Sequence, residues 1–182
     1  MLKLNNLAGF GAKRASAGGG SAATWNPLVK GSAVTLSNGN LTTSYAAYTG
    51  SNVRATVGKQ TGKWYWEFTV TAIAASCAVN CGVWPGSRAI ATYIYVTTGV
   101  ARFWSPQLAV NDVVGFAFDA DAGTCAVYKN NSLHDTKTVT IGGEDWYPVV
   151  GDDNASGTFT CVANFGATAF TYTPPSGFIA LS

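Results

Sequence analysis

The stretch NDVVGFAFDADAGTCAVYKNNSL, residues 111–133, contains two apolar runs and the turns that follow them. Apolar side chains occupy every second position from Val114 to Phe118, and the alternation resumes at Cys125 and Val127, a spacing typical of half-buried β-strands. Between the runs lies DADAG, in which the aspartates can accept hydrogen bonds from backbone N–H groups and the glycine allows a positive φ angle. The stretch therefore predicts a β-hairpin.

A second turn, Lys129-Asn130-Asn131-Ser132, follows the hairpin, and we expect Asn131 to be its left-handed residue. Outside this stretch the two-residue period recurs, and no helical period is sustained. The sequence therefore predicts an all-β protein. The expected strands are residues 33–36, 41–44, 53–57, 63–70, 79–83, 92–96, 101–104, 113–118, 124–128, 137–141, 147–150 and 158–163.

The expected strand at residues 63–70, KWYWEFTV, is the richest in aromatic side chains. Its alternate positions point to opposite faces of a sheet. One face carries Trp64, Trp66, Phe68 and Val70, and the other carries Tyr65, Glu67 and Thr69. We expect the tryptophan face to be core, because an apolar stripe at strand spacing is usually buried. The alternative is an exposed row of tryptophans that stacks on sugars.

Several segments, in the same order along the chain, resemble the SPRY domain. The hairpin stretch resembles the central signature of that family, and GKWYWEFTV resembles its early aromatic strand. Further matches are WYPVVG, VANFG and FTYTPPSGF, at residues 146–151, 162–166 and 170–178. The upstream segment TWNPLVKGSAVTLSNGNLT resembles SPRY proteins encoded by tailed bacteriophages. One departure is Asn131, where the family usually has glycine. The resemblance implies an antiparallel two-sheet β-sandwich, concanavalin-like, with ligand-binding loops at one end.

The 182 residues divide into an N-terminal arm with a Gly-rich linker at 1–23 and a sandwich at 24–182. The arm carries scattered apolar residues that it cannot bury alone, so it packs on its own domain or docks on another subunit. We favour docking for assembly; a strand that covers a sheet edge is the alternative. The apolar residues of the arm are Leu2, Leu4, Leu7 and Phe10.

Charged residues are only 11% of the chain, and the net charge is +2. Such a surface is either covered by neighbours in an assembly or solvated by its many Ser, Thr and Asn residues. Lys13-Arg14 is the longest basic run, so nucleic-acid binding has no electrostatic signature. The sequence has no apolar run long enough for membrane insertion, and Asn5 and Gly9 interrupt any secretory signal. We expect synthesis and assembly in a host cytoplasm.

Residue types for catalysis are sparse. The single histidine, His134, is expected in a solvated loop, and a nucleophilic triad would require it. Asp119 and Asp121 could mimic a glycosidase acid pair or half of a calcium loop. Their turn position explains them sufficiently. We therefore expect a protein that is not an enzyme and that has no metal or cofactor.

Four cysteines are present. Cys77 and Cys81 would lie about 13 Å apart on one strand, too far for a disulfide unless that segment is a loop. Cys125 and Cys161 occupy core-facing positions, so we expect buried free thiols there. The spacing of the cysteines fits no standard zinc site.

Because the sequence shows no catalytic constellation, we expect the protein to function by binding a partner or ligand. The family resemblance implies ligand contacts in the loops at 45–52, 84–89, 103–107 and 152–157. The individual candidates are aromatic residues for stacking and charged residues for polar groups. They are Tyr48, Trp84, Arg88, Trp104 and Asp153.

The first functional hypothesis is a non-enzymatic phage virion protein, a decoration of the head, collar or tail or part of a fibre. Its arm would bind other virion proteins, and the chain would be a homo-oligomer or be present in multiple copies in the assembly. The alternative is a receptor-binding tail-fibre or spike module that recognises a host surface glycan or protein. A polysaccharide hydrolase and an intracellular peptide-binding adaptor are less favoured, because the chain has neither the alternating acids of the former nor the partner domain of the latter.

Overall fold

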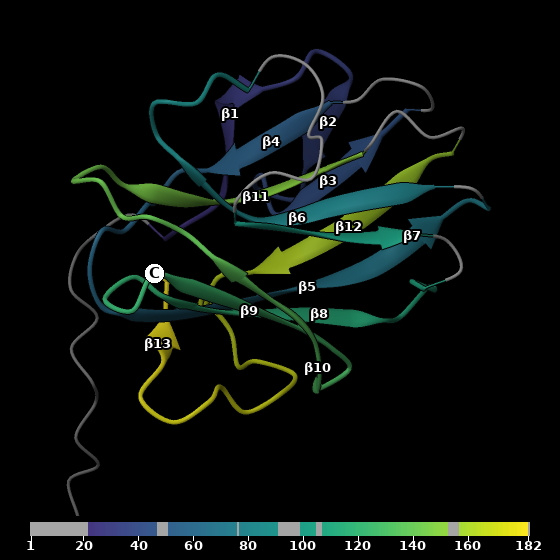
Figure 1. The fold of residues 1–182 in the computed structure, drawn as a ribbon. Helices are drawn as coiled ribbons and strands as arrows, with labels where there is room; N and C mark the ends of the chain where they lie inside the picture. The colour runs from purple at the N-terminus through teal and green to yellow at the C-terminus, as the bar shows by residue number, and fades with distance from the viewer. Residues whose placement is uncertain are drawn as a thin grey trace, which may run out of the picture.

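The computed structural model of the chain describes residues 22–46, 51–75, 77–90, 99–104, 107–152 and 157–181. These residues form two antiparallel sheets packed face to face (Figure 1), which confirms the all-β prediction. The five-stranded sheet consists, in spatial order, of β1 (Trp25–Lys30), β4 (Asn52–Ala55), β11 (Trp146–Asp152), β6 (Ala78–Pro85) and β7 (Val100–Trp104).

The eight-stranded sheet has β5 near its centre. In spatial order its strands are β10 (Ser132–Thr138), β9 (Thr124–Lys129), β8 (Val113–Asp119), β5 (Lys63–Ile73), β12 (Phe159–Asn164), β3 (Thr42–Tyr45) and β2 (Val34–Ser37). The short strand β13 (Ile179–Ala180) pairs in parallel with the start of β5.

The core lies between the two sheets, and the aromatic face of β5 belongs to it. Trp66, Phe68 and Val70 are buried there, and the Trp66 ring stacks on Phe116 of β8 with ring centroids 5.1 Å apart. Stacked aromatic pairs add to the free energy gained by burial of their apolar area. The prediction that this face is core is confirmed for these three residues, while Trp64, near the start of the strand, is only partly buried and packs against the core.

Both turns of the β8–β9–β10 meander follow the predicted chemistry. Gly123 has a φ of 66°, and Asp119 accepts the Ala122 N–H at 2.9 Å. Asn130 and Asn131 both have positive φ angles, 47° and 66°. Two consecutive left-handed residues form the tight hairpin turn whose twist matches that of the flanking strands.

Three elements differ from the sequence prediction. Strands β1 and β13 were not expected, because WNPLVK contains a proline and β13 has only two residues. Strand β10 begins at Ser132 instead of residue 137, since the two-residue turn starts a new strand at once and a bulge between Leu133 and Asp135 breaks the alternation. The strand expected at 92–96 lies outside the described residues.

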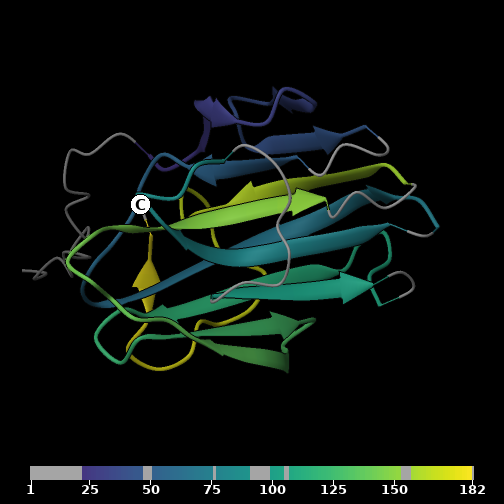
Figure 2. The ribbon, with the colours of Figure 1, turned by 45° about the horizontal axis from the view of Figure 1, so that its top comes forward.

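The strand directions give the sandwich two different ends. We call the loop end the one where β3, β7 and β11 finish and β4, β6 and β12 begin; the pairs Asp152–Val79, Ala78–Trp104 and Phe159–Tyr45 lie there. At the opposite, terminal end, β1 begins and β13 pairs with β5. Figure 2 shows the carboxyl terminus on the side away from the tips of β7 and β11. Both ends of the described chain therefore lie opposite the loop end.

Candidate binding surface at the loop end

The structure separates the predicted ligand-binding residues. Trp104 ends β7 at the loop end, although the described structure does not extend to its side chain. Trp84 and Arg88 lie at the other end of β6, since Trp84 pairs with Tyr147 near the start of β11. Tyr48 and Asp153 lie outside the described residues, as do residues 1–21 of the arm, which carry Leu2, Leu4, Leu7 and Phe10. As ligand or assembly contacts, all of these remain predictions.

Trp84 is a packing residue of the five-stranded sheet. Its side chain is only 1% exposed and clusters with Ile90, Val100 and Val149 on the outer face of that sheet, away from the core between the sheets. The Arg88 guanidinium lies 4.9 Å from the Trp84 ring centroid, in cation–π geometry. A ligand could stack on the Trp84 ring only if the side chains that bury it moved away.

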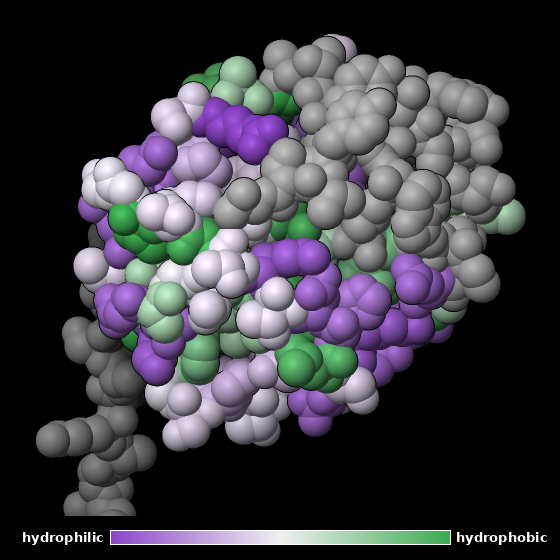
Figure 3. All heavy atoms as spheres, in the orientation of Figure 1, coloured by the Kyte–Doolittle hydropathy of each residue, from purple (hydrophilic) through white to green (hydrophobic). Residues whose placement is uncertain are grey.

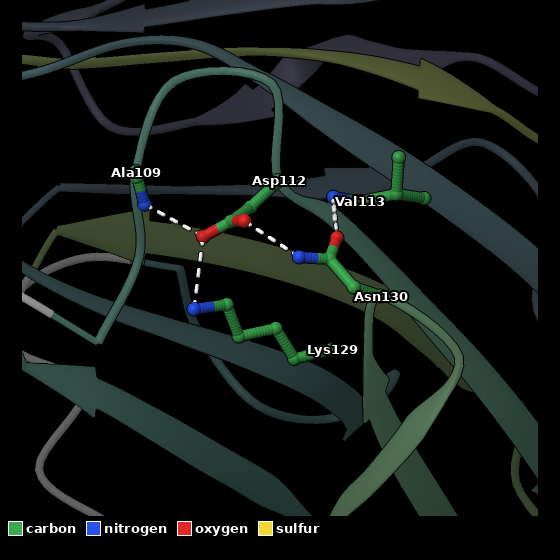
Figure 4. A network of polar contacts seen from close by, with 5 residues as sticks. All are labelled: Ala109, Asp112, Val113, Lys129 and Asn130. Carbon is green, nitrogen blue, oxygen red and sulfur yellow. Dashed lines mark hydrogen bonds and ion pairs between the residues drawn. The ribbon is translucent and has the colours of Figure 1, made fainter.

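A polar network braces the loop end from the side of the eight-stranded sheet (Figure 4). Asp112 accepts the Ala109 N–H at 2.7 Å and the Asn130 side-chain N–H at 2.7 Å, and it pairs with Lys129 at 3.0 Å. Asn130 in turn accepts the Val113 N–H at 2.9 Å. The loop before β8 is thus fastened to the turn between β9 and β10.

The charge of Asp112 is stabilised by this network. Burial alone would raise the pKa of Asp112, but the hydrogen bonds from Asn130 and Ala109 and the contact with Lys129 together hold that pKa below its ordinary value. Sequence analysis did not identify this network. Every residue of the network except Ala109 lies in the stretch at residues 111–133. The residues meet because Val114 and Lys129 are register partners on neighbouring strands.

A row of buried polar residues crosses the five-stranded sheet at the loop end. Asn52 of β4, Gly151 of β11 and Asn80 of β6 are register partners, and both asparagines are fully buried. Among the residues that the structure describes, neither the side-chain nitrogen nor the side-chain oxygen of Asn52 has a hydrogen-bond partner. Gly151 is required there, because a Cβ atom would collide with the Asn52 side chain. Buried polar groups are nearly always hydrogen-bonded in native proteins, so an amide of this kind calls for an explanation such as a bound water or ion.

Beside this row, one bond within the five-stranded sheet and one bond between the two sheets fix the loop end. The buried Asp152 accepts the Ser51 N–H at 2.6 Å, and the Tyr45 hydroxyl donates to the Val150 carbonyl at 2.8 Å. Burial raises the pKa of Tyr45 well above its ordinary value, so the hydroxyl stays protonated and donates. The ends of β3, β4 and β11 are therefore a rigid support for the connections between them.

The cysteines are all free and buried, as expected for Cys125 and Cys161. Burial raises the pKa of these two thiols to about 12 and that of Cys77 to about 11. Cys161 also exchanges a hydrogen bond with the Thr43 hydroxyl at 3.2 Å. A thiol with so high a pKa is a poor nucleophile at neutral pH, so these residues act as core side chains.

The acids at the terminal end are bonded to the fold. Asp119 pairs with Lys63 at 2.9 Å, and Asp121 accepts the Gly62 N–H at 2.8 Å. Their turn role is thus confirmed. His134 is exposed, as expected, but it lies in strand β10 and not in a loop, and it stacks on Phe103 with ring centroids 4.1 Å apart.

Within the ranges that the structure covers, no group of three or more His, Cys, Asp or Glu side chains could hold a metal ion. Over the same ranges, no helix has the length and apolar character needed to cross a bilayer.

No protein-family model and no curated protein matches the sequence. Solved structures match the fold. The SPRY domain of human HERC1 is 15% identical, with a TM-score of 0.57 over 80% of this chain and 99% of that domain. The TRIM65 PSpry domain is 14% identical, with a TM-score of 0.54 over 79% of this chain and 92% of that one.

The stonustoxin structure is 17% identical, with a TM-score of 0.55; the match covers 79% of this chain but 27% of that one. Identities this low establish fold alone. SPRY domains are typically binding modules and not catalysts. The chain therefore has the two-sheet sandwich fold of SPRY domains.

Proposed function

We propose that this chain is a non-enzymatic display module of a bacteriophage particle. In this proposal the arm at residues 1–23 holds the domain in the particle, and the loop end faces outward. The observation that carries the proposal is that the terminal end and the loop end lie on opposite sides of the sandwich. Thr24 is fixed at the terminal end by hydrogen bonds with Thr56, while β3, β7 and β11 all finish at the other end.

A sandwich suits this task because its strands span the whole distance between attachment and contact. The two sheets share one aromatic core, so the loop end cannot move independently of the terminal end. The phage context comes from the resemblance of residues 24–42 to segments of phage-encoded SPRY proteins.

The surface also bears on the proposal. On the face drawn in Figure 3, hydrophobic side chains are scattered among hydrophilic ones and form no large continuous patch. Exposed large hydrophobic residues in the described ranges lie on separate elements: Leu28, Val110, Leu133 and Ile179. A face without a large apolar patch supports attachment through the arm instead of through the body of the sandwich.

The experiment compares phage particles that carry the full chain with particles made from a gene that lacks residues 1–23. We expect deletion to remove the protein from purified particles, measured by mass spectrometry, while the truncated sandwich still folds. A matched variant replaces Leu2, Leu4, Leu7 and Phe10 with serine and keeps the length of the arm. Full incorporation of both variants would overturn the proposal.

The alternative is a receptor-binding module for a host glycan or protein. The unpaired Asn52 amide beside the loop end favours it. Here particles with Trp104→Ala would still contain the protein but would adsorb poorly to host cells. In the decoration proposal, Trp104→Ala leaves adsorption unchanged.

A further inference from the structure

A hollow of about 160 Å³ opens on the outer face of the eight-stranded sheet, outside the loop-end site. Its floor and one wall come from the sheet, and the opposite wall comes from the C-terminal segment that crosses it. The lining residues are Tyr65, Tyr128, Asn131, Thr173 and Pro175.

One sheet position next to the lining residues Tyr65 and Tyr128 lacks a side chain. Glu67 of β5, Gly115 of β8 and Tyr128 of β9 are register partners across three strands. The Tyr65 side chain lies across Gly115, since a Cβ atom there would come within 2.5 Å of the Tyr65 hydroxyl. The tyrosine ring therefore fills the place between β5 and β9 and forms part of the lining.

The C-terminal wall is held in a fixed position. Glu67 accepts the backbone N–H groups of Thr171 at 2.8 Å and Tyr172 at 3.0 Å, and the Tyr65 hydroxyl at 2.9 Å. The Phe170 ring packs edge-on against Tyr65 with centroids 4.9 Å apart. These contacts hold the chain just before Thr173, and the pairing of β13 with β5 holds it after Pro175, so the hollow is a preformed feature.

The lining combines ring faces with uncharged polar groups. Two phenol rings and a pyrrolidine ring supply apolar surface, and no lining residue is charged. The side chains of Tyr128, Asn131 and Thr173 make no hydrogen bond to the residues that the structure describes. Convergent polar groups around aromatic surface are the usual composition of a small-ligand site.

We propose that this hollow binds one uncharged sugar ring. The C–H face of a pyranose would stack on Tyr128, and its hydroxyls would exchange hydrogen bonds with Asn131 and Thr173. An anionic ligand is disfavoured, because no lining residue is cationic and the Glu67 carboxylate lies close by. The volume is below the roughly 300–1,000 Å³ of pockets for drug-sized molecules, which limits the occupant to a single ring.

The test is a ¹H–¹⁵N NMR titration of the full chain with a panel of neutral methyl glycosides. We expect one glycoside to bind with a dissociation constant on the order of millimolar and to shift the amide signals of Tyr128, Asn131 and Thr173. Tyr128→Ala should weaken binding about tenfold or more by loss of the stacking face.

A second variant avoids any loss of folding. Asn131→Gly removes the side-chain amide at a position with positive φ, which glycine adopts readily; it should weaken binding several-fold with the fold intact. Ser132→Ala, at the neighbouring exposed position that does not line the hollow, should leave binding unchanged.

Two results would overturn the proposal: no glycoside shifts these signals, or binding survives both Tyr128→Ala and Asn131→Gly. A proline-rich peptide that shifts the same signals when no glycoside does would also reject a sugar. Shifts confined to the loop end would assign the sugar to the other site. The titration uses isolated protein, so its result does not depend on incorporation into particles.

Discussion

The two sheets differ in how their outer faces, those turned away from the core, are covered. On the eight-stranded sheet the C-terminal segment at residues 165–181 is bonded to the buried carboxylate of Glu67. On the five-stranded sheet the cover is an apolar cluster around Trp84, which includes Ile90 from beyond the end of β6. A face of an antiparallel sheet is often polar and solvated, but both faces here are partly closed.

The two covers use different forces, with different consequences. The free energy gained by apolar contact is proportional to the buried area and has no direction. The cluster around Trp84 therefore stabilises the fold but does not by itself select a unique position for the segment that covers the sheet. Hydrogen bonds to Glu67 require particular N–H groups at particular distances. The polar cover is therefore the more precisely positioned of the two, and the proposed sugar hollow lies beside it.

The largest predicted effect is on the apolar cover. Trp84→Ala should lower the free energy of unfolding by about 3–5 kcal/mol, because it leaves a cavity in a fully buried cluster. Urea denaturation followed by fluorescence measures the change. Leu28→Ala, at a side chain that is 92% exposed, is the control and should change stability by no more than about 0.5 kcal/mol. Equal effects would mean that the cluster is not packed.

The C-terminal segment that covers the eight-stranded sheet should be destabilised when Glu67 loses one of its acceptor oxygens. Glu67→Gln keeps the shape but replaces an oxygen with an NH₂ donor, so a buried N–H or hydroxyl loses its partner, at a cost of about 1–3 kcal/mol. Hydrogen exchange of the Thr171 and Tyr172 amides should accelerate. Glu144→Gln, whose bonds to Ser87 are exposed, is the matched control and should have a smaller effect. Unchanged exchange would contradict the role of Glu67.

Gly115→Ala tests the close approach of Tyr65. The new methyl group would contact the Tyr65 hydroxyl. We expect the free energy of unfolding to fall by an amount at the lower end of roughly 1–3 kcal/mol, because the displaced atom is the tip of a side chain. Tyr65→Phe removes that oxygen. In a double-mutant cycle, the stability losses of Gly115→Ala and Tyr65→Phe should therefore add up to more than the loss of the double variant. Strict additivity would argue against the contact.

Arg54 links the segment after β6 to the five-stranded sheet. Its guanidinium lies 4.4 Å from the Tyr147 ring centroid and donates to the Gly86 carbonyl at 2.9 Å. Arg54→Lys keeps the charge but loses the planar stacking, and it should cost about 1 kcal/mol. Thermal unfolding measures this change. If lysine preserved full stability, charge alone would account for the role of Arg54.

Acid should weaken the loop end before it affects the apolar cover. The folded pKa of Asp112 lies below its ordinary value of 3.8, so its network stabilises the fold above that value and loses its contribution as the pH falls through the folded pKa. Asp112→Asn should be less stable than the parent at pH 7, and the difference should shrink toward pH 2. A constant difference across this range would show that Asp112 acts by packing alone.

Most of the sandwich could be predicted from the sequence, because alternation and turn chemistry are local. The hairpin around Gly123 was predicted, as was the aromatic face of β5 apart from the partial exposure of Trp64. The candidate site was harder to predict. Trp84 and Trp104 both follow apolar runs and look equivalent in sequence, yet strand direction puts them at opposite ends of the sandwich.

By itself, the sequence determined most of the strands, the turns of the β8–β9–β10 meander and which face of β5 points to the core, because side-chain alternation and φ preferences act within a few residues. The tertiary structure alone decided what covers the outer faces. Glu67 is buried only because a segment about a hundred residues later folds over it, and Asp112 meets Lys129 only in one strand register. Such contacts depend on the packing of distant segments, which no local pattern encodes.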